Sequence, residues 1–233
     1  MSSDPEVRAR IKLISERVSP AAEDCDVVFN GITGLLPVPL HVRAGVFDPS
    51  RGKSARRMAE AILAHPPPDN ARVLEIGTGS GILSIIAFRQ AHIALTAVDI
   101  NLIAVACAHD NFTRNGVQAH CAVSDLFSAV QGKFDCIIFN APTAHSSIKP
   151  GAKGETTLWD TTGTLKQRFV DSAIEHLRGP DAQILMMYAR YRDYDSTPDL
   201  SRFDARKLLV ESDAIGESGV LRLTPKAPSS GPA

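Results

Sequence analysis

The sequence has few cysteines, and no two of them lie at a metal-binding spacing. The four cysteines, Cys25, Cys107, Cys121 and Cys136, are far apart along the chain and form no C-x-x-C motif. Neither a disulfide framework nor a structural zinc site is therefore expected, and no metal is predicted. Reduced thiols of this kind suit a cytoplasmic protein, and we predict that localisation.

The sequence also lacks a long hydrophobic run and an excess of charge of one sign. No apolar stretch approaches the length of a membrane span, and residues 1–5 do not show the basic-then-apolar pattern of a signal peptide. The formal net charge is −1, which gives no overall positive field for nucleic acid. We therefore predict no membrane partner, and a nucleic-acid partner is not expected. No signal of an oligomeric state is present.

The chain has enough apolar residues for one large domain with an extension. It is 233 residues long, with 44% hydrophobic and 22% charged residues, which is ordinary for a globular protein. Three successive prolines at residues 66–68 form a stiff connector at the predicted domain boundary. We predict an N-terminal cap and lid over residues 1–68, a main domain over 69–225 and a disordered tail over 226–233.

The N-terminal extension carries signals for two helices and a hairpin. Apolar residues recur at near-helical spacing over residues 4–18, with Asp4 placed as the N-cap. The dipeptide Asn30-Gly31 between apolar residues predicts a β-hairpin. A second helix is predicted over residues 54–64, with its apolar side chains on one face.

The main part alternates short apolar strands with helices, which predicts an α/β fold. Such alternation favours right-handed βαβ units and a parallel sheet covered by helices on both faces. The first four predicted strands are residues 72–76, 95–98, 118–121 and 134–139, followed by 184–188, 208–211 and 220–223. The last two suit a terminal hairpin. Helices are predicted over residues 81–90, 102–115 and 165–177.

The most informative stretch is the glycine turn Gly77-Thr78-Gly79-Ser80-Gly81, between a predicted strand and a predicted helix. Glycines let a ligand approach the backbone without meeting a Cβ atom, and the free N–H groups of the helix start face that ligand. A turn of this kind predicts a nucleoside or phosphate site.

Polar side chains follow the next three strands, where the predicted strands end. Asp99 lies about twenty residues beyond the glycine turn, where a carboxylate can accept hydrogen bonds from ribose hydroxyls. Asp125 follows the third strand and could meet the amino group of adenine, and Asn140 follows the fourth. Ligands of open α/β sheets bind at this edge.

In this set of motifs the chain resembles the class I S-adenosylmethionine-dependent methyltransferases over about residues 72–188. It is similar in detail to the branch with an N-P-P-Y-like motif after the fourth strand, which holds release-factor glutamine methylases, ribosomal-protein methylases and nucleic-acid amino-methylases. The resemblance implies a Rossmann-like, seven-stranded, mostly parallel sheet whose last strand is antiparallel.

The resemblance also implies the cofactor, S-adenosylmethionine, with S-adenosylhomocysteine as product, and its contacts. Asp99 would hold the ribose and Asp125 the adenine amine. The methionine end would lie on the glycine turn, next to Glu75. The remaining contacts would be the turn residues and apolar or secondary neighbours: Gly77, Thr78, Gly79, Gly81, Ile100, Leu126, Phe127, Asn140, Phe47 and Ser54.

At the reacting end, the chain reads Asn140-Ala141-Pro142-Thr143. In the branch it resembles, the Asn oxygen and the following proline carbonyl hold a planar amino group so that its lone pair meets the methyl group, which is catalysis by positioning. Asn140, Pro142 and Thr143 are the predicted catalytic residues. Thr143 stands where the branch has an aromatic residue, so the stacking platform is absent.

Three functions are compatible with these residues. The first is a methyltransferase acting on a small-molecule substrate or a protein side chain. The second is a cyclase that converts S-adenosylmethionine to azetidine-2-carboxylate and methylthioadenosine, and the third is a non-catalytic cofactor-binding module. A nicotinamide oxidoreductase is disfavoured because Ile82 occupies the position of the third glycine of the dinucleotide motif.

Overall fold

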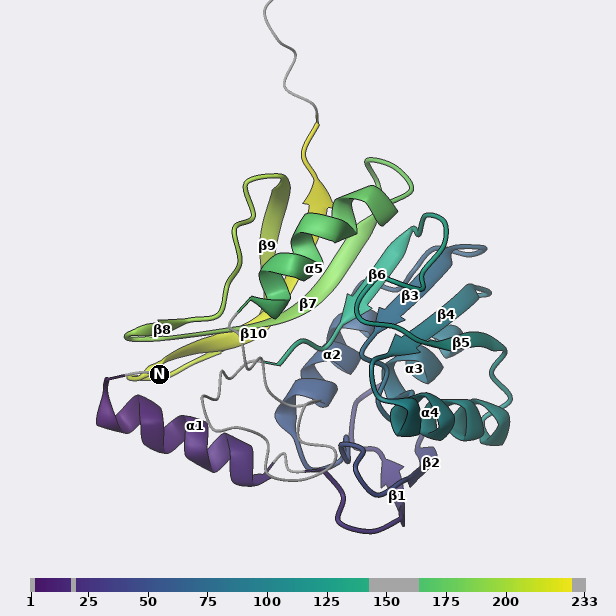
Figure 1. Ribbon diagram of the computed structural model, residues 1–233, viewed down its shortest axis with the longest axis horizontal. Helices are drawn as coiled ribbons and strands as arrows, with labels where there is room; N and C mark the ends of the chain where they lie inside the picture. The colour runs from purple at the N-terminus through teal and green to yellow at the C-terminus, as the bar shows by residue number, and fades with distance from the viewer. Residues whose placement is uncertain (1–2, 18–19, 143–163, 228–233) are drawn as a thin grey trace, which may run out of the picture.

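The fold is a mostly parallel β-sheet with helices on both faces (Figure 1), in a computed structural model that describes residues 3–17, 20–142 and 164–227. Its strands run in the order β5-β4-β3-β6-β7-β10-β9, with the short β8 paired to β7. Their bounds are β3 Arg72–Ile76, β4 Ala94–Asp99, β5 Ala119–Val123, β6 Cys136–Phe139, β7 Gln183–Tyr191, β8 Tyr194–Asp195, β9 Phe203–Ser212 and β10 Gly216–Pro225.

The last strand runs against its neighbours. Strand β10 pairs antiparallel with both β7 and β9, whereas β5, β4, β3, β6 and β7 pair parallel to one another. The predicted Rossmann-like sheet with an antiparallel last strand is therefore confirmed, as is the terminal hairpin of β9 and β10.

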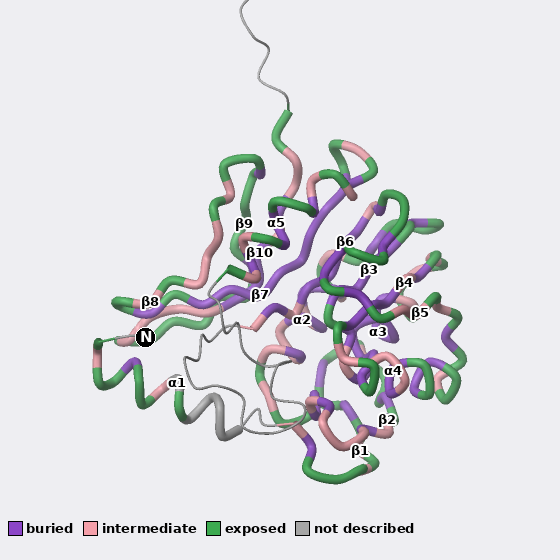
Figure 2. Tube along the Cα trace, viewed as in Figure 1, coloured by how far each residue is buried: buried purple, intermediate pink, exposed green. Residues whose placement is uncertain are grey.

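The central strands are buried on both faces, as their continuous apolar sequences require. All four residues of β6 are buried, and four of the five in β3 (Figure 2). Two hydrophobic clusters result, one on each face of the sheet. Helix α5 (Leu165–Ala173), with the 3₁₀ turn Ile174–His176, covers one face. Helices α2 (Lys53–Ala64), α3 (Ile82–Gln90) and α4 (Leu102–Arg114) cover the other.

The N-terminal part forms helix α1 and a hairpin. Helix α1 (Pro5–Arg17) begins at Asp4, whose Oδ1 accepts a hydrogen bond of 2.8 Å from the N–H of Glu6, so the predicted N-cap is confirmed. Strand β1 (Cys25–Phe29) pairs antiparallel with β2 (Val38–Val42). The hairpin is present, but its connection spans residues 30–37, so Asn30-Gly31 begins a longer loop and not a two-residue turn.

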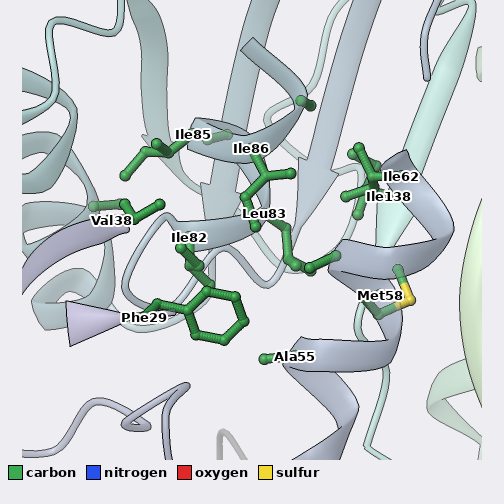
Figure 3. Packing of buried hydrophobic residues seen from close by; sticks show 14 of the residues in the cluster. Phe29, Val38, Ala55, Met58, Ile62, Ile82, Leu83, Ile85, Ile86 and Ile138 are labelled. Carbon is green, nitrogen blue, oxygen red and sulfur yellow. The ribbon is translucent and has the colours of Figure 1, made fainter. Parts of the chain in front are cut away.

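The hairpin and α2 share a core with α3. Figure 3 shows their side chains converging: Phe29 and Val38 of the hairpin, Ala55, Met58 and Ile62 of α2, and Ile82, Leu83, Ile85 and Ile86 of α3. Buried side chains on both sides of residue 68 thus belong to one cluster. The boundary at residue 68 stays a prediction.

No described helix is both long enough and apolar enough to cross a membrane.

Helix α4 packs unusually close to the glycine turn. Gly81 has φ of +82°, and a Cβ atom added to it would lie 2.7 Å from Cε1 of Phe112. We predict that Gly81→Ala lowers the free energy of unfolding by roughly 2–4 kcal/mol, because left-handed strain and overpacking add. Denaturant unfolding measures the loss.

Gly116→Ala is the matched control. Gly116 also has positive φ, +66°, but a Cβ there would meet nothing within 4 Å. Only the backbone strain of roughly 1–2 kcal/mol is expected. Equal losses in the two variants would show that the contact with Phe112 is unimportant.

Candidate functional site

The carboxyl ends of three parallel strands lie side by side at one edge of the sheet. Ile76 at the end of β3 is in register with Val98 of β4 and with Phe139 of β6. The residues that follow these positions therefore meet at the same edge. They are the glycine turn, Asp99 and Asn140.

The glycine turn is hydrogen-bonded to the end of β4. The N–H groups of Gly77 and Thr78 both donate to the carbonyl of Val98, at 2.8 and 3.0 Å. Gly77 and Gly79 have φ of +69° and +54°, which only glycine adopts without strain. Gly77 is exposed, whereas Thr78 is buried, so the turn presents bare backbone to solvent at this edge.

Glu75 is a buried carboxylate beneath the turn, with only 1% of its surface exposed. Its Oε2 accepts hydrogen bonds from Oγ1 of Thr78 (2.9 Å), from the N–H of Ser84 (3.1 Å) and from the Ser84 hydroxyl. Burial raises the pKa of Glu75 to about 7, against the effect of these bonds. Glu75 thus fixes the turn to the first turn of α3.

Asp99 joins the other side of the turn to β4. Its Oδ2 accepts a hydrogen bond of 3.0 Å from the N–H of Gly79, and its Oδ1 accepts one of 2.9 Å from the N–H of Asn101. Burial raises the pKa of this carboxyl as well. The neighbouring Ile100 leaves 57% of its surface exposed, so an apolar side chain stands free beside the carboxylate.

Asp125 lies farther along the same edge, after β5. Its carboxylate forms an ion pair with Arg168 of α5, at 2.7 Å, and remains 45% exposed. Leu126 and Phe127 are each only 8% exposed. The ring of Phe127 stacks on His176 in the 3₁₀ turn after α5, with centroids 4.6 Å apart, and also on Phe169 of α5. Phe127 therefore packs towards α5. An open groove of about 520 Å³ is lined by residues 125–128 together with Arg168 and Asp171 of α5.

Asn140 carries a buried polar atom that has no partner among the described residues. Within the described part of the chain, its Oδ1 accepts no hydrogen bond. An unpaired buried amide oxygen costs free energy, which makes it a candidate acceptor for a donor from a bound molecule. Ala141 beside it is buried and Pro142 is half-buried. Thr143 lies outside the described residues.

The remaining predicted residues are not joined to this edge by any hydrogen bond among the residues described. Phe47 is half-buried and its backbone forms a bridge with Pro20. Ser54 is half-buried in the first turn of α2. The cofactor and catalytic roles given to all of these residues stay predictions.

Sequence reasoning missed two residues that hold the turn. Ser84 donates to Glu75, and Asn111 of α4 donates to the carbonyl of Ser80 at 2.9 Å. Both are fully buried. For Ser84 the available signal was a single polar residue among the apolar residues of α3, whereas Asn111 follows two polar residues, His109 and Asp110, and gave no such signal. The described residues contain no group of three potential metal ligands.

An open α/β sheet of this strand order, with a glycine turn and two acidic strand ends, defines a class I S-adenosylmethionine-dependent methyltransferase. Residues 38–203 match the methyltransferase small domain family. The chain belongs to that family, and the resemblance seen in its motifs is confirmed.

Two relatives are methyltransferases of ribosomal components. The ribosomal RNA small subunit methyltransferase C of Aeromonas hydrophila is 30% identical over 173 residues, which cover 73% of this chain and 45% of that protein. The ribosomal protein L11 methyltransferase of Thermosipho melanesiensis is 44% identical over 84 residues, covering 36% of this chain and 33% of that protein. The chain thus matches less than half the length of these relatives.

Solved structures agree on the fold. A methyltransferase from Pyrococcus furiosus has a TM-score of 0.51 at 16% identity, covering 96% of this chain and all of the other. TrmN from Thermus thermophilus has a TM-score of 0.51 at 18% identity, covering 79% of this chain and 50% of the other.

The expectation that nucleic acid is no partner is wrong. Relatives that match the chain include ribosomal RNA methyltransferases, alongside ribosomal protein methyltransferases. The expectation rested on a net charge of −1, and net charge describes the field of the whole molecule. It does not report the local surface around a site.

The buried carboxyl of Glu75 gives a pH-dependent prediction. The pKa of Glu75 is about 7 in the folded protein, whereas an unperturbed glutamate, as in the unfolded chain, has a pKa of 4.5. The folded protein therefore binds this proton more tightly. Stability from this group is therefore present below pH 4.5 and is lost as pH rises through 7. The loss amounts to about 3 kcal/mol. Glu75→Gln should remove this slope.

Unfolding by denaturant between pH 4 and pH 8 compares the two proteins without ligand. The difference between the two curves isolates Glu75 from other carboxyls, including that of Asp99. Parallel curves would mean that Glu75 ionises in the folded protein as it does in water.

Proposed function

We propose that this chain transfers the methyl group of S-adenosylmethionine to an amino nitrogen of a ribosomal component, with ribosomal RNA as the first candidate. Its family supports the methyl transfer. The alignment with a ribosomal RNA methyltransferase spans 173 residues, more than the 84 aligned with the L11 methyltransferase, and supports the choice of RNA. The second candidate, a ribosomal protein, is supported by the L11 methyltransferase.

The cofactor would bind along the edge formed by the strand ends. The exposed backbone of Gly77 would face its methionine end, and Asp99 would accept hydrogen bonds from the ribose hydroxyls. Ile100, exposed beside Asp99, supports an apolar contact with adenine. Asp125 keeps its carboxylate 45% exposed, so it could accept a bond from the adenine amine without giving up Arg168.

The acceptor role of Asn140 carries the proposal. Its buried Oδ1, which has no partner among the described residues, would accept a hydrogen bond from the amino group to be methylated, and the carbonyl of Pro142 would accept a second. Two such bonds fix the plane of the amino group and direct its lone pair at the methyl carbon. The sulfonium group supplies the methyl, and its sulfur takes the electrons of the broken bond. The nitrogen would then lose one proton to water. Positioning alone supplies such catalysis.

Asn140→Ala tests this role. We expect methyl transfer to fall by at least about a hundredfold, because the acceptor loses its alignment, with cofactor affinity changed by less than about threefold. Calorimetry gives the affinity for S-adenosylmethionine, and transfer of labelled methyl groups gives the rate. Asn30→Ala, in the exposed hairpin loop, is the matched control. An unchanged rate in Asn140→Ala would contradict the assignment.

The acceptor is identified by labelling ribosomal subunits with methyl-labelled cofactor. Label that is lost on treatment with ribonuclease identifies RNA, and label lost on treatment with protease identifies protein. Absence of label in both, with intact cofactor binding, would refute a ribosomal acceptor.

The same incubation tests the cyclase alternative, which the family and the relatives above do not support. Methyl transfer leaves S-adenosylhomocysteine, whereas cyclisation leaves methylthioadenosine even without an acceptor. Chromatography of the nucleoside products should give S-adenosylhomocysteine only.

A further inference from the structure

We propose that Asn111 is a positioning residue that couples the N-terminal hairpin to the glycine turn, so that the hairpin contributes to cofactor affinity. The inference rests on the proposed role of the turn as the cofactor cradle. Asn111 lies in α4, behind the turn, and is fully buried. It contacts the glycine turn from behind, through the carbonyl of Ser80, and is proposed to touch neither the substrate nor the cofactor itself.

The amide of Asn111 bonds to two segments far apart in the sequence. Its Nδ2 donates to the carbonyl of Ser80 in the turn at 2.9 Å and to the carbonyl of His41 in β2 at 2.9 Å. Its Oδ1 accepts a hydrogen bond of 2.8 Å from the N–H of His41. The orientation of the amide follows from these partners, because carbonyls only accept and a backbone N–H only donates.

The hydrogen bonds from Asn111 to His41 occupy the edge of β2 that has no neighbouring strand among the described residues. Strand β2 pairs on one side with β1, where His41 faces Asp26. The N–H and carbonyl of His41 both bond to Asn111, so the amide of one side chain satisfies this part of the open edge of β2. Removing it would take this partner from the N–H of His41 on the hairpin and from the carbonyl of Ser80 on the turn, while the carbonyl of His41 would keep its bond from the Cys107 thiol.

Helix α4 supports the turn at two adjacent positions. Asn111 holds the carbonyl of Ser80, and the ring of Phe112 lies so close to Gly81 that no side chain fits between them. The back of the turn is thus fixed to α4, while Gly77 at its front is exposed. A change in the position of Asn111 would therefore alter the surface that the cofactor meets.

The asparagine at the C-cap of α4 provides a matched control. Asn115 donates to the carbonyl of Pro39 at 3.0 Å and to the carbonyl of Asn111, and its Oδ1 accepts a hydrogen bond of 3.0 Å from Arg89. It therefore also ties the hairpin to the end of α4, through one bond, and among the described residues it makes no hydrogen bond to the glycine turn. Comparing Asn111→Ala with Asn115→Ala separates loss of the turn contact from loss of the hairpin contact.

We expect Asn111→Ala to raise the Kd for S-adenosylmethionine roughly tenfold, and Asn115→Ala to change it by less than about twofold. Both variants should melt at lower temperature. Saturating cofactor should restore the turn in Asn111→Ala, so KM for the cofactor should rise while kcat is kept. A purely structural defect would lower kcat through the active fraction and leave KM unchanged.

A measurement on the unchanged protein covers the case in which Asn111→Ala fails to fold. Coupling is reciprocal, so cofactor bound at the turn should slow hydrogen exchange at the N–H of His41, which bonds to Asn111. Nuclear magnetic resonance follows that amide and the amide of Gly79 together. Protection of Gly79 without protection of His41 would overturn the proposal.

The outcomes also separate this inference from the proposed function. Cofactor binding by the unchanged protein, with equal Kd values in the two variants, would refute the role of Asn111 alone. No cofactor binding by the well-folded, unchanged protein would refute the cradle and, with it, the coupling.

Discussion

The site depends on how tightly the glycine turn is held from behind. Gly77 and Thr78 donate to the carbonyl of Val98, and Gly81 lies against Phe112 where no Cβ fits. Because α4 and β4 occupy the rear of the turn, its front has only backbone atoms to offer a ligand. All three glycines have left-handed backbone conformations, which favour glycine, and at Gly81 the packing against Phe112 also excludes a side chain.

Two buried carboxylates beside the turn add an electrostatic constraint. Glu75 and Asp99 are both buried, and the charge of Asp99 adds to the burial that raises the pKa of Glu75. Each carboxylate is held by hydrogen bonds from the turn or from the residues next to it. A cation at this edge would favour their charged forms. S-adenosylmethionine, the proposed ligand, brings a sulfonium and an ammonium group.

The parallel part of the fold was predictable because its central strands are mostly apolar runs that are followed by polar residues. Residues 72–76 are β3 as predicted, and the antiparallel last strand follows the family resemblance. The candidate edge was predictable for the same reason, since parallel strand ends must meet. The hairpin connection was not, because Asn30-Gly31 is compatible with both a tight turn and the longer loop that pairing of Phe29 with Val38 requires.

The sequence by itself determined the order of strands and helices and the glycine turn, because periodicity and backbone requirements are local properties. Only the tertiary structure decided what each polar side chain contacts. There, Ser84 donates a hydrogen bond to Glu75, and the ring of Phe127 stacks on His176. Oδ1 of Asn140 has no partner among the described residues. Asn111 joins residues 41 and 80, which no local pattern connects. Such contacts depend on how the helices pack on the sheet, and this packing brings together residues far apart in the chain.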